Sequence, residues 1–446
     1  MKVLMLGWEY PPHIAGGLGV ACEGLTKALA QLGVEITFVV PKLMGDENAP
    51  HMNLRDACGK KYKRRRQKRI KTFEIPVALA PYLTEESFDD LVGELDLPET
   101  RRLLNKNFFP KFTRSELDKF LASLTLAKRA QILLGAGYNA QVYEQVALFA
   151  DLVFEIAKEE EFDIVHAHDW MTFPAGIAVA QAAGVPLITH VHSLEYDRSG
   201  PGINPRIDAI EKAGTGFATA ICAVSEHTRQ VVQKQHCLPL SKIFTVHNGN
   251  LSKKVTKFHK DKAKWTGPVV LFLGRVTLQK GPATFLYAAQ KVIAYLPDTI
   301  FVMAGTGDLL PSMKQLAKDL GISSNLIFPG FVKGRALEEI LSIANLYVMP
   351  SISEPFGLSA LEAVDFETPA LISKQSGVGE VLNHALKFDY WKIQTLADYI
   401  INGLLHPEMC QDMIDGAKLE LKKLTWQAAA KKVLKIYQHV CGVQHA

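Results

Sequence analysis

Short apolar runs separated by stretches with helical periodicity make up most of this chain. In the first 250 residues the strand-sized runs fall at Lys2–Leu6, Ile36–Val40, Ile164–Ala167, Leu187–Val191, Ala220–Val224 and Ile243–Val246. Runs that are apolar throughout are typical of strands buried on both faces of a parallel sheet. Their alternation with helices predicts a doubly wound α/β lobe over residues 1–250.

The same pattern restarts after a polar, lysine-rich segment, Asn250–Lys264. The second set of runs falls at Pro268–Leu273, Ile300–Ala304, Leu326–Pro329, Leu346–Pro350 and Ala370–Ser373. It predicts a second doubly wound lobe over residues 265–424. Beyond it, Thr425 can cap a helix whose apolar positions are Ala429, Val433, Ile436 and Val440. We expect this last segment, residues 425–446, to pack back on the first lobe.

A long insertion, about residues 44–160, separates the second and third expected strands. Its end carries Val142, Val146, Phe149, Val153 and Ile156 at spacings of four and three, which predicts an amphipathic helix. Earlier, Lys60–Lys71 holds nine cations in twelve positions. This run is either a solvated loop leading into the strand-like Phe73–Leu79, or a patch that contacts an anionic membrane surface or an acidic partner.

Composition narrows the class of protein. The chain has 446 residues, 48% hydrophobic and 22% charged, which is enough to bury a core in each lobe. A formal charge of +4 is too small for a dedicated nucleic-acid binder but is compatible with anionic small ligands. The six cysteines are scattered, without C-x-x-C spacing, as is typical of a reducing compartment. Since Met1–Leu6 predicts a strand rather than a signal peptide, and no apolar run approaches membrane-spanning length, we expect a cytoplasmic protein.

Two polar clusters follow strands of the second lobe. The first contains Gly274, Arg275 and Lys280, which places two cations beyond a buried strand. The second, EPFGLSALE, joins a strand to a helix that should begin near Gly357 and Leu358. Cations and the free N–H groups of a helix N-terminus both favour negative charge. Together the two clusters predict a site for a diphosphate that leaves a sugar, although the two cations taken alone would be ordinary surface charges.

Glu354 and Glu362 lie on either side of the same strand–helix junction. A carboxylate can accept two hydrogen bonds from a vicinal diol. We therefore expect Glu354 to bind sugar hydroxyls and Glu362 to bind a nucleotide ribose. The alternative for Glu362 is a solvated helix residue.

A glycine-rich loop follows the first strand. Gly16, Gly17 and Gly19 precede a helix expected near Val20 and would let the backbone approach a phosphate closely. Gly16 comes ten residues after Leu6, which is too late for a dinucleotide-binding fingerprint. The sequence therefore disfavours a nicotinamide enzyme.

Histidines end two neighbouring strands of the first lobe. His166 and His168 precede Asp169, and His190 and His192 end the next strand on one face. An H-x-H pair can chelate a metal, but no further ligand follows at a recognisable spacing, so we expect none. We expect Asp169 to orient a substrate hydroxyl or to cap the following helix. One histidine of the second pair should contact substrate, the alternative being a hydrogen-bonded core histidine.

These motifs resemble those of the retaining glycosyltransferases of the two-lobed GT-B class, family 4 or group 1, with glycogen and starch synthase features in the first lobe. SEPFGLSALEA matches the family's Glu, seven residues, Glu signature, and GRVTLQKG matches its G-R-x(4)-K-G element. MAGTGD, FPGFV and GVGEVL match neighbouring elements, and HAHDW and THVHSL resemble the synthases' H-x-H-D-W and T-x-H-N-L. Ile14 stands where the synthases carry a lysine, which leaves the acceptor open.

The resemblance implies two Rossmann-like lobes facing across a cleft. It also implies transfer of a hexose from UDP- or ADP-glucose to an acceptor hydroxyl, such as that of a glucan, by front-face attack with retention. No cofactor and no metal are implied, because Arg275 and Lys280 would take the place of a cation. The implied catalytic residues are His192, Asp169, Arg275, Lys280 and Glu354. The implied donor-binding residues are Gly16, Gly17, Arg275, Lys280, Phe331, Glu354, Phe356, Gly357, Leu358 and Glu362.

Two other classes fit the same motifs. A nucleotide-sugar epimerase of the same fold would convert its substrate without any acceptor. A catalytically silent sugar-nucleotide-binding protein would bind the donor without turnover.

Overall fold

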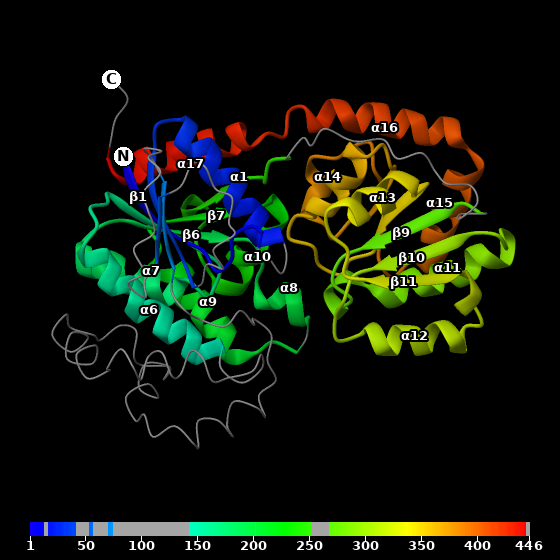
Figure 1. Cartoon of the computed structure of the whole chain (residues 1–446), viewed down its shortest axis with the longest axis horizontal. Coiled ribbons are helices and arrows are strands. Elements are labelled where there is room, and N and C mark those ends of the chain that lie inside the picture. The colour runs from blue at the N-terminus through cyan, green and yellow to red at the C-terminus, as the bar shows by residue number, and fades with distance from the viewer. Residues whose placement is uncertain are drawn as a thin grey trace, which may run out of the picture.

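The computed structural model describes residues 1–12, 17–41, 53–56, 70–74, 142–200, 202–250 and 267–442. Two α/β lobes lie side by side, each built on a sheet whose described strand pairs are all parallel (Figure 1). Separate apolar clusters fill the two faces of each sheet. The structure thus confirms the predicted α/β class with two doubly wound lobes.

The first lobe contains a sheet in the order β3-β4-β2-β1-β5-β6-β7-β8. Its strands are β1 (Lys2–Leu6), β2 (Glu35–Val40), β3 (Asn53–Asp56), β4 (Ile70–Glu74), β5 (Ile164–His168), β6 (Leu187–Val191), β7 (Ala220–Ala223) and β8 (Ile243–Thr245). On one face lie α1 (Gly17–Gln31) and α17 (Trp426–Val440). The other face carries α6 (Val142–Lys158), α7 (Phe173–Ala183) and α9 (Pro205–Phe217), while α8 (Glu195–Ser199) and α10 (Glu226–His236) follow β6 and β7.

The described parts of the insertion add to its prediction. A strand at Ile70–Glu74 overlaps the start of the predicted Phe73–Leu79, and the rest of that prediction, residues 75–79, lies outside the described residues. A second strand, Asn53–Asp56, was not predicted. The amphipathic helix predicted at the end of the insertion is present as α6. Most of the basic run, residues 60–69, lies outside the described residues, so membrane contact there stays a prediction.

The second lobe contains a sheet in the order β11-β10-β9-β12-β13-β14. Its strands are β9 (Val269–Leu273), β10 (Ile300–Ala304), β11 (Leu326–Gly330), β12 (Leu346–Met349), β13 (Ala370–Ser373) and β14 (Leu386–Phe388). Its helices are α11 (Pro282–Tyr295), α12 (Leu310–Asp319), α13 (Arg335–Ile343), α14 (Leu358–Asp365), α15 (Ile393–Leu405) and α16 (Pro407–Leu421). Short 3-10 turns include η2 (Leu278–Lys280) and η4 (Gly377–Glu380). No described helix has both the length and the apolar character needed to cross a membrane.

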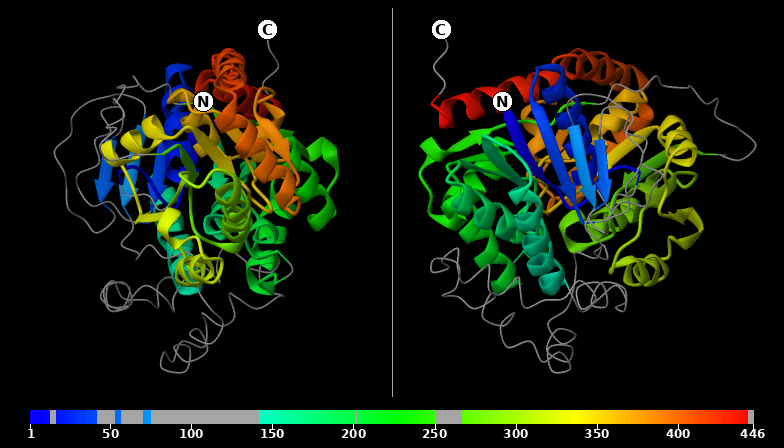
Figure 2. Two further views of the ribbon diagram at one scale, coloured as in Figure 1. Left: turned by 90° about the vertical axis from the view of Figure 1, so that its right-hand side faces the viewer. Right: turned by 60° about the vertical axis from the view of Figure 1, so that its left-hand side comes forward.

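The chain crosses between the lobes again after α16, and α17 packs on α1 of the first lobe (Figures 1 and 2). Thr425 caps α17 through a 3.2 Å hydrogen bond from the N–H of Ala428. Trp426 is 5% exposed, and its indole ring lies directly over Gly24 of α1. The first turn of the last helix therefore fits against the first helix only because position 24 has no side chain.

Gly24→Ala tests this packing. A Cβ at position 24 would lie 2.2 Å from Cε2 of Trp426, so one helix must shift, and we expect a loss of about 1–3 kcal/mol in the free energy of unfolding. Gly216→Ala is the matched control, because a Cβ there would meet no atom within 4 Å in α9. The control should gain about 0.5–1 kcal/mol from its better helix propensity. Equal stabilities of the two variants in urea denaturation would contradict the assignment.

Candidate active site at the boundary of the lobes

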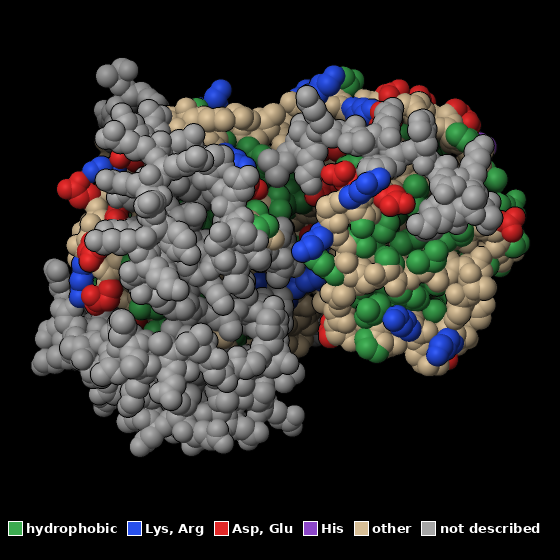
Figure 3. Space-filling view, in the orientation of Figure 1, with side chains coloured by type: hydrophobic (Ala, Val, Ile, Leu, Met, Phe, Trp, Pro, Cys, Tyr) green, Lys and Arg blue, Asp and Glu red, His purple; other side chains and the backbone are tan. Residues whose placement is uncertain are grey.

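The strand order changes direction between β1 and β5 in the first sheet and between β9 and β12 in the second. At such a switch point the following loops diverge and open a crevice at the carboxyl ends of the strands. Arg275 and Lys280 follow β9, and Glu354 follows β12. The two polar clusters of the sequence therefore meet at the switch point of the second sheet. On the face shown in Figure 3, Lys and Arg side chains lie along the boundary between the lobes.

Lys280 and Glu354 form an ion pair that joins the two loops. The lysine side chain is 20% exposed and the glutamate side chain 8%. Ser351 donates a second hydrogen bond, of 3.1 Å, to the same carboxylate oxygen, Oε2 of Glu354. The loops approach closely at Gly281, which has a φ of +63°, because a Cβ there would lie 2.1 Å from the carbonyl oxygen of Pro350. The two sequence motifs thus form one charged, partly desolvated unit.

The helix that follows Glu354 begins as predicted. Gly357 has a φ of +110°, and α14 starts at Leu358, with Glu362 about one turn further on. Leu358 reaches the first lobe, since a Cβ on Gly17 would lie 3.3 Å from its Cδ1 atom. The N-terminus of α14 and the loop after β1 therefore border the same space.

The glycine-rich loop differs from its prediction. The helix α1 begins at Gly17 rather than near Val20, and its Gly19 N–H already donates to Oε1 of Glu9 at 2.9 Å. The N–H of Gly19 therefore already has a carboxylate acceptor and is not available to a phosphate. Gly16 and Ile14 lie outside the described residues.

Two predicted donor-binding residues, Phe331 and Phe356, have opposite exposures. Phe331 is 59% exposed and follows β11, which is two strands from β9, so only an extended ligand would reach it. Phe356 is 3% exposed and packs in the core of the second lobe, 6.0 Å from the ring of His247. Arg275 is half-buried and donates from Nη2 to Oε1 of Gln279 at 3.3 Å.

Across the boundary, four histidine rings from β5 and β6 stack on one another. The ring centroids of His166 and His168 are 4.5 Å apart, those of His168 and His190 5.0 Å, and those of His190 and His192 4.4 Å. Burial lowers the pKa of all four, that of His192 to about 3. The four rings are therefore neutral near pH 7.

His190 and His192 differ in their hydrogen bonding. His192 bonds through Nε2 to Nδ1 of His168 at 2.9 Å, which leaves its Nδ1 atom for another group. His190 is 2% exposed and has no hydrogen-bond partner at either ring nitrogen in the described part of the chain. His190 is thus a core histidine, but the expectation that such a residue would be hydrogen-bonded was wrong.

Two sets of possible metal ligands occur within this stack. In each set the donor atoms lie within 4.8 Å of one another; the sets are His166, His190 and Cys222, and His168, His190 and His192. Nitrogen and sulfur donors suit a zinc-like cation. In the first set His166 also contacts the hydroxyl of Tyr437 at 2.5 Å, and in the second His192 and His168 bond to each other. The absence of a catalytic metal stays a prediction from the sequence.

Asp169 holds the turn that carries His192. Its backbone is left-handed, with a φ of +59°, and its Oδ1 atom accepts the N–H groups of His192 and Ser193 at 2.7 and 3.3 Å. Burial raises the pKa of Asp169 to about 7, against the opposing effect of these N–H groups and of Arg198. The prediction that this carboxylate caps the next helix was wrong, because α7 has Thr172 at its N-cap.

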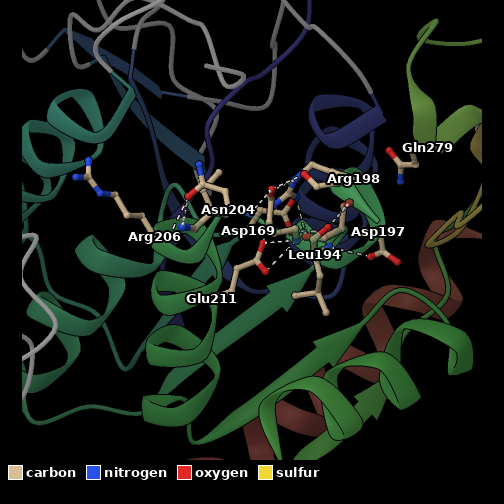
Figure 4. A network of polar contacts seen from close by, with 12 residues as sticks. Asp169, Leu194, Asp197, Arg198, Asn204, Arg206, Glu211 and Gln279 are labelled. Atoms are coloured by element: carbon tan, nitrogen blue, oxygen red, sulfur yellow. Dashed lines mark hydrogen bonds and ion pairs between the residues drawn. The ribbon is translucent and has the colours of Figure 1, made fainter. Parts of the chain in front are cut away.

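A buried polar network extends from this turn through α8 and α9 (Figure 4). Arg198 donates to Glu195 at 3.2 Å and to Glu211 at 2.6 Å, and both carboxylate oxygens of Glu211 accept the N–H of Glu195 at 2.9 Å. Burial raises the pKa of Glu211 to about 8, opposed chiefly by Arg198. None of these residues was predicted to be functional, because no local spacing in the sequence distinguishes them from solvated charges.

The lobes are joined through the N-terminus of α10. Ser225 caps this helix and donates to the carbonyl oxygen of Pro355 in the second lobe at 2.6 Å. Glu380 of η4 accepts the N–H groups of Glu226 and His227 at 2.8 and 2.7 Å. A carboxylate of one lobe thus satisfies the free donors of a helix in the other.

Three family models match successive parts of the chain. The model described as glycosyl transferases group 1 matches residues 254–420. Glycosyltransferase family 4 matches residues 137–250, and the starch synthase catalytic domain matches residues 2–88. Together they span both lobes.

Relatives and a solved structure that the chain resembles are also glycosyltransferases or sugar synthases by name. An uncharacterised glycosyltransferase of Methanocaldococcus jannaschii is 25% identical over 98% of this chain and 98% of its own length. A glycogen synthase of Mycobacterium tuberculosis is 24% identical over 98% and 94%. Among solved structures, a sucrose-phosphate synthase from Thermosynechococcus elongatus gives a TM-score of 0.71 at 17% identity, covering 99% of this chain and 100% of its own. Anabaena HepE in complex with UDP and glucose gives 0.65 at 14%, covering 98% and 100%. Both structures show the same two-lobed fold.

Lys280→Met tests the ion pair. The change leaves the Glu354 carboxylate desolvated without its cation, and we expect a loss of about 2–4 kcal/mol in the free energy of unfolding. The double variant Lys280→Met with Glu354→Gln removes both charges and should regain most of that loss. Chemical denaturation checks both. A single variant as stable as the wild type, or a double variant no better than the single, would show that the contact carries no stability.

Asp169→Asn tests the burial of this carboxyl group. Because its folded pKa of about 7 exceeds the ordinary 3.8, its stabilising contribution is full below about pH 4 and is lost as the pH rises through 7. The asparagine variant cannot ionise. The free energy of unfolding of the variant minus that of the wild type should therefore rise between about pH 4 and pH 7, by on the order of 2–4 kcal/mol. A difference that stays constant with pH in urea titrations would refute the shift.

Proposed function

Because glycosyltransferase models match successive parts of both lobes, we propose that the chain transfers glucose from a nucleoside diphosphate sugar to a carbohydrate hydroxyl with retention at the anomeric carbon. The observation that carries this proposal is the Lys280–Glu354 pair at the switch point of the second sheet. It places a cation and a carboxylate beside the N-terminus of α14. Such a site suits a ligand with a diphosphate at one end and hydroxyl groups at the other.

The leaving diphosphate gains negative charge as its bond to the sugar breaks. Arg275 and Lys280, together with the first N–H groups of α14, would stabilise that charge and need little rearrangement to do so. Lys280 would then be shared between Glu354 and the diphosphate. Oε2 of Glu354 already accepts from Lys280 and Ser351, which leaves Oε1 for a sugar hydroxyl. Glu362 on α14 would bind the ribose.

The acceptor side would be formed by the first lobe. His192 is neutral near pH 7, so it would hydrogen-bond a sugar hydroxyl through Nδ1 rather than supply charge. Asp169 would act through the turn that it holds, because its Oδ1 atom is taken by two backbone N–H groups. With no carboxylate assigned as a nucleophile, we propose front-face attack, in which the diphosphate takes the proton of the acceptor as it leaves.

The ligands and names of similar proteins guide the choice of substrates to test. HepE was crystallised with UDP and glucose, and one curated relative is a glycogen synthase. UDP-glucose is therefore the first donor to test, with ADP-glucose beside it, and a glucan is the first acceptor. No cofactor is proposed, and a metal is not required by this scheme.

A screen for nucleotide release tests the proposal. The purified chain is incubated with UDP-, ADP- and GDP-sugars, with and without glucan, lipid-linked and small-sugar acceptors. We expect release that depends on an acceptor, with an α-linked product from an α-linked donor by NMR. Conversion of the sugar without any acceptor would indicate an epimerase, and binding without turnover a silent module. A covalent glycosyl-enzyme trapped with a fluorinated donor would contradict front-face attack.

Arg275→Ala tests the diphosphate site. We expect kcat/KM for the donor to fall by about 10²–10³-fold, because one fixed charge that stabilises the leaving group is lost. Lys291→Ala is the matched control, since it removes an exposed cation from α11 of the same lobe and should change kcat/KM less than twofold. Equal effects of the two substitutions would mean that only the overall charge matters. UDP affinity by calorimetry should weaken in the first variant alone.

A further inference from the structure

One carboxylate contacts both of the loops that carry the proposed substrate-binding residues. Oδ1 of Asp197 accepts the hydroxyl of Ser353 at 2.6 Å, and its Oδ2 atom accepts the N–H of Leu194 at 2.9 Å. Ser353 directly precedes Glu354, and Leu194 is two residues after His192. Asp197 thus links the Glu354 loop of the second lobe to the histidine turn of the first.

The link is buried and is built from strong contacts. Asp197 is 3% exposed, and a buried carboxylate is tolerated only where hydrogen bonds compensate for lost water. Burial raises the pKa of Asp197, and the hydrogen bonds from Ser353 and Leu194 lower it again. Hydrogen bonds to a charged acceptor are among the stronger contacts in proteins. One carboxylate oxygen of Asp197 therefore accepts from the Glu354 loop, and the other accepts from the His192 turn.

The loop that carries Glu354 is already fixed within its own lobe. The N–H of Glu354 donates to Gln375 at 2.8 Å, and its carbonyl oxygen accepts from Gly377 at 2.9 Å. The side chain of Ser353 instead points to the first lobe, where Nε2 of His227 also lies 3.5 Å from its hydroxyl oxygen. The position of Glu354 relative to the first lobe thus depends on contacts made by its two neighbours, Ser353 with Asp197 and Pro355 with Ser225.

We propose that Asp197 is a positioning residue, which sets the distance between the Glu354 loop and the His192 turn by holding Ser353 and Leu194 on one carboxylate. This inference rests on the proposed transfer reaction. Transfer needs the anomeric carbon, bound in the second lobe, to face an acceptor hydroxyl held by the first. A displacement of about 1 Å between the two groups can cost on the order of 10²-fold in rate.

Ser353→Ala is the primary test, because it removes the hydrogen bond between Asp197 and the second lobe and leaves the Leu194 contact in place. We expect kcat for transfer to fall about 10–100-fold, with UDP affinity and donor KM within about twofold of the wild type. Asp197→Ala should give a similar fall, since it removes the oxygen that accepts from the Ser353 hydroxyl. The two substitutions together should be less than multiplicative, because both act on one contact.

Asn250→Ala is the matched control. Its side chain donates to Asp365 at the far end of α14, at 2.7 Å, so it also joins the lobes but does not touch the Asp197 carboxylate. We expect kcat within about twofold of the wild type. An equal fall in the control would mean that losing any contact between the lobes lowers kcat, so that Asp197 has no special role. An unchanged kcat in Ser353→Ala would also overturn the proposal.

Hydrogen–deuterium exchange of the full chain gives a readout that does not depend on activity. In Ser353→Ala, exchange should increase in peptides covering residues 192–197 and 351–356 together, and in Asn250→Ala it should not. If the wild type transfers no sugar but exchange changes in this way, the proposed function fails while the link between the loops stands. If the wild type is active and neither kcat nor exchange responds to Ser353→Ala, the positioning role is wrong.

Discussion

A desolvated ion pair at the switch point of the second sheet, between Lys280 and Glu354, is the contact on which the site depends. Neither charge is well solvated, so each is stable there only with the other in place. The pair requires the loops after β9 and β12 to approach closely. Gly281 permits that approach, because any side chain at this position would collide with the carbonyl group of Pro350. The ion pair therefore requires both the glycine at position 281 and the strand order of the second sheet.

The two sides of the boundary between the lobes differ in their electrostatics. The second lobe presents the charged groups Arg275, Lys280 and Glu354. The first lobe presents neutral imidazoles, and in Asp169 a carboxyl group whose pKa burial raises to about 7. Such a division fits a ligand that is anionic at one end and rich in hydroxyls at the other. It also explains why the mild net charge of the chain gives little hint of the site.

The relative position of the lobes is itself set by polar contacts. Glu380 satisfies the free N–H groups of α10, and Ser225 donates to the carbonyl oxygen of Pro355. At the other end, Trp426 packs on Gly24, so the last helix of the chain becomes part of the first lobe. Pro355 lies next to Glu354, which means that the contacts joining the lobes also fix the site. The structure therefore couples the placement of the lobes to the placement of the loop that we propose binds the sugar.

Most strand positions, the division into two lobes and the two polar clusters were predictable from the sequence, because apolar run length and motif spacing are local properties. The same holds for the helix that begins at Leu358 and for the periodic residues of α6 and α17. The short strands β3 and β14 were not predicted. Only the tertiary structure paired Lys280 with Glu354, 74 residues apart, and Ser353 with Asp197, 156 residues apart. It also showed that Asp169, expected to orient a substrate hydroxyl or to cap a helix, holds the His192 turn. The burial of a side chain and the residues that it contacts depend on which strands are neighbours in the sheet. The periodicity of the sequence does not determine that strand order.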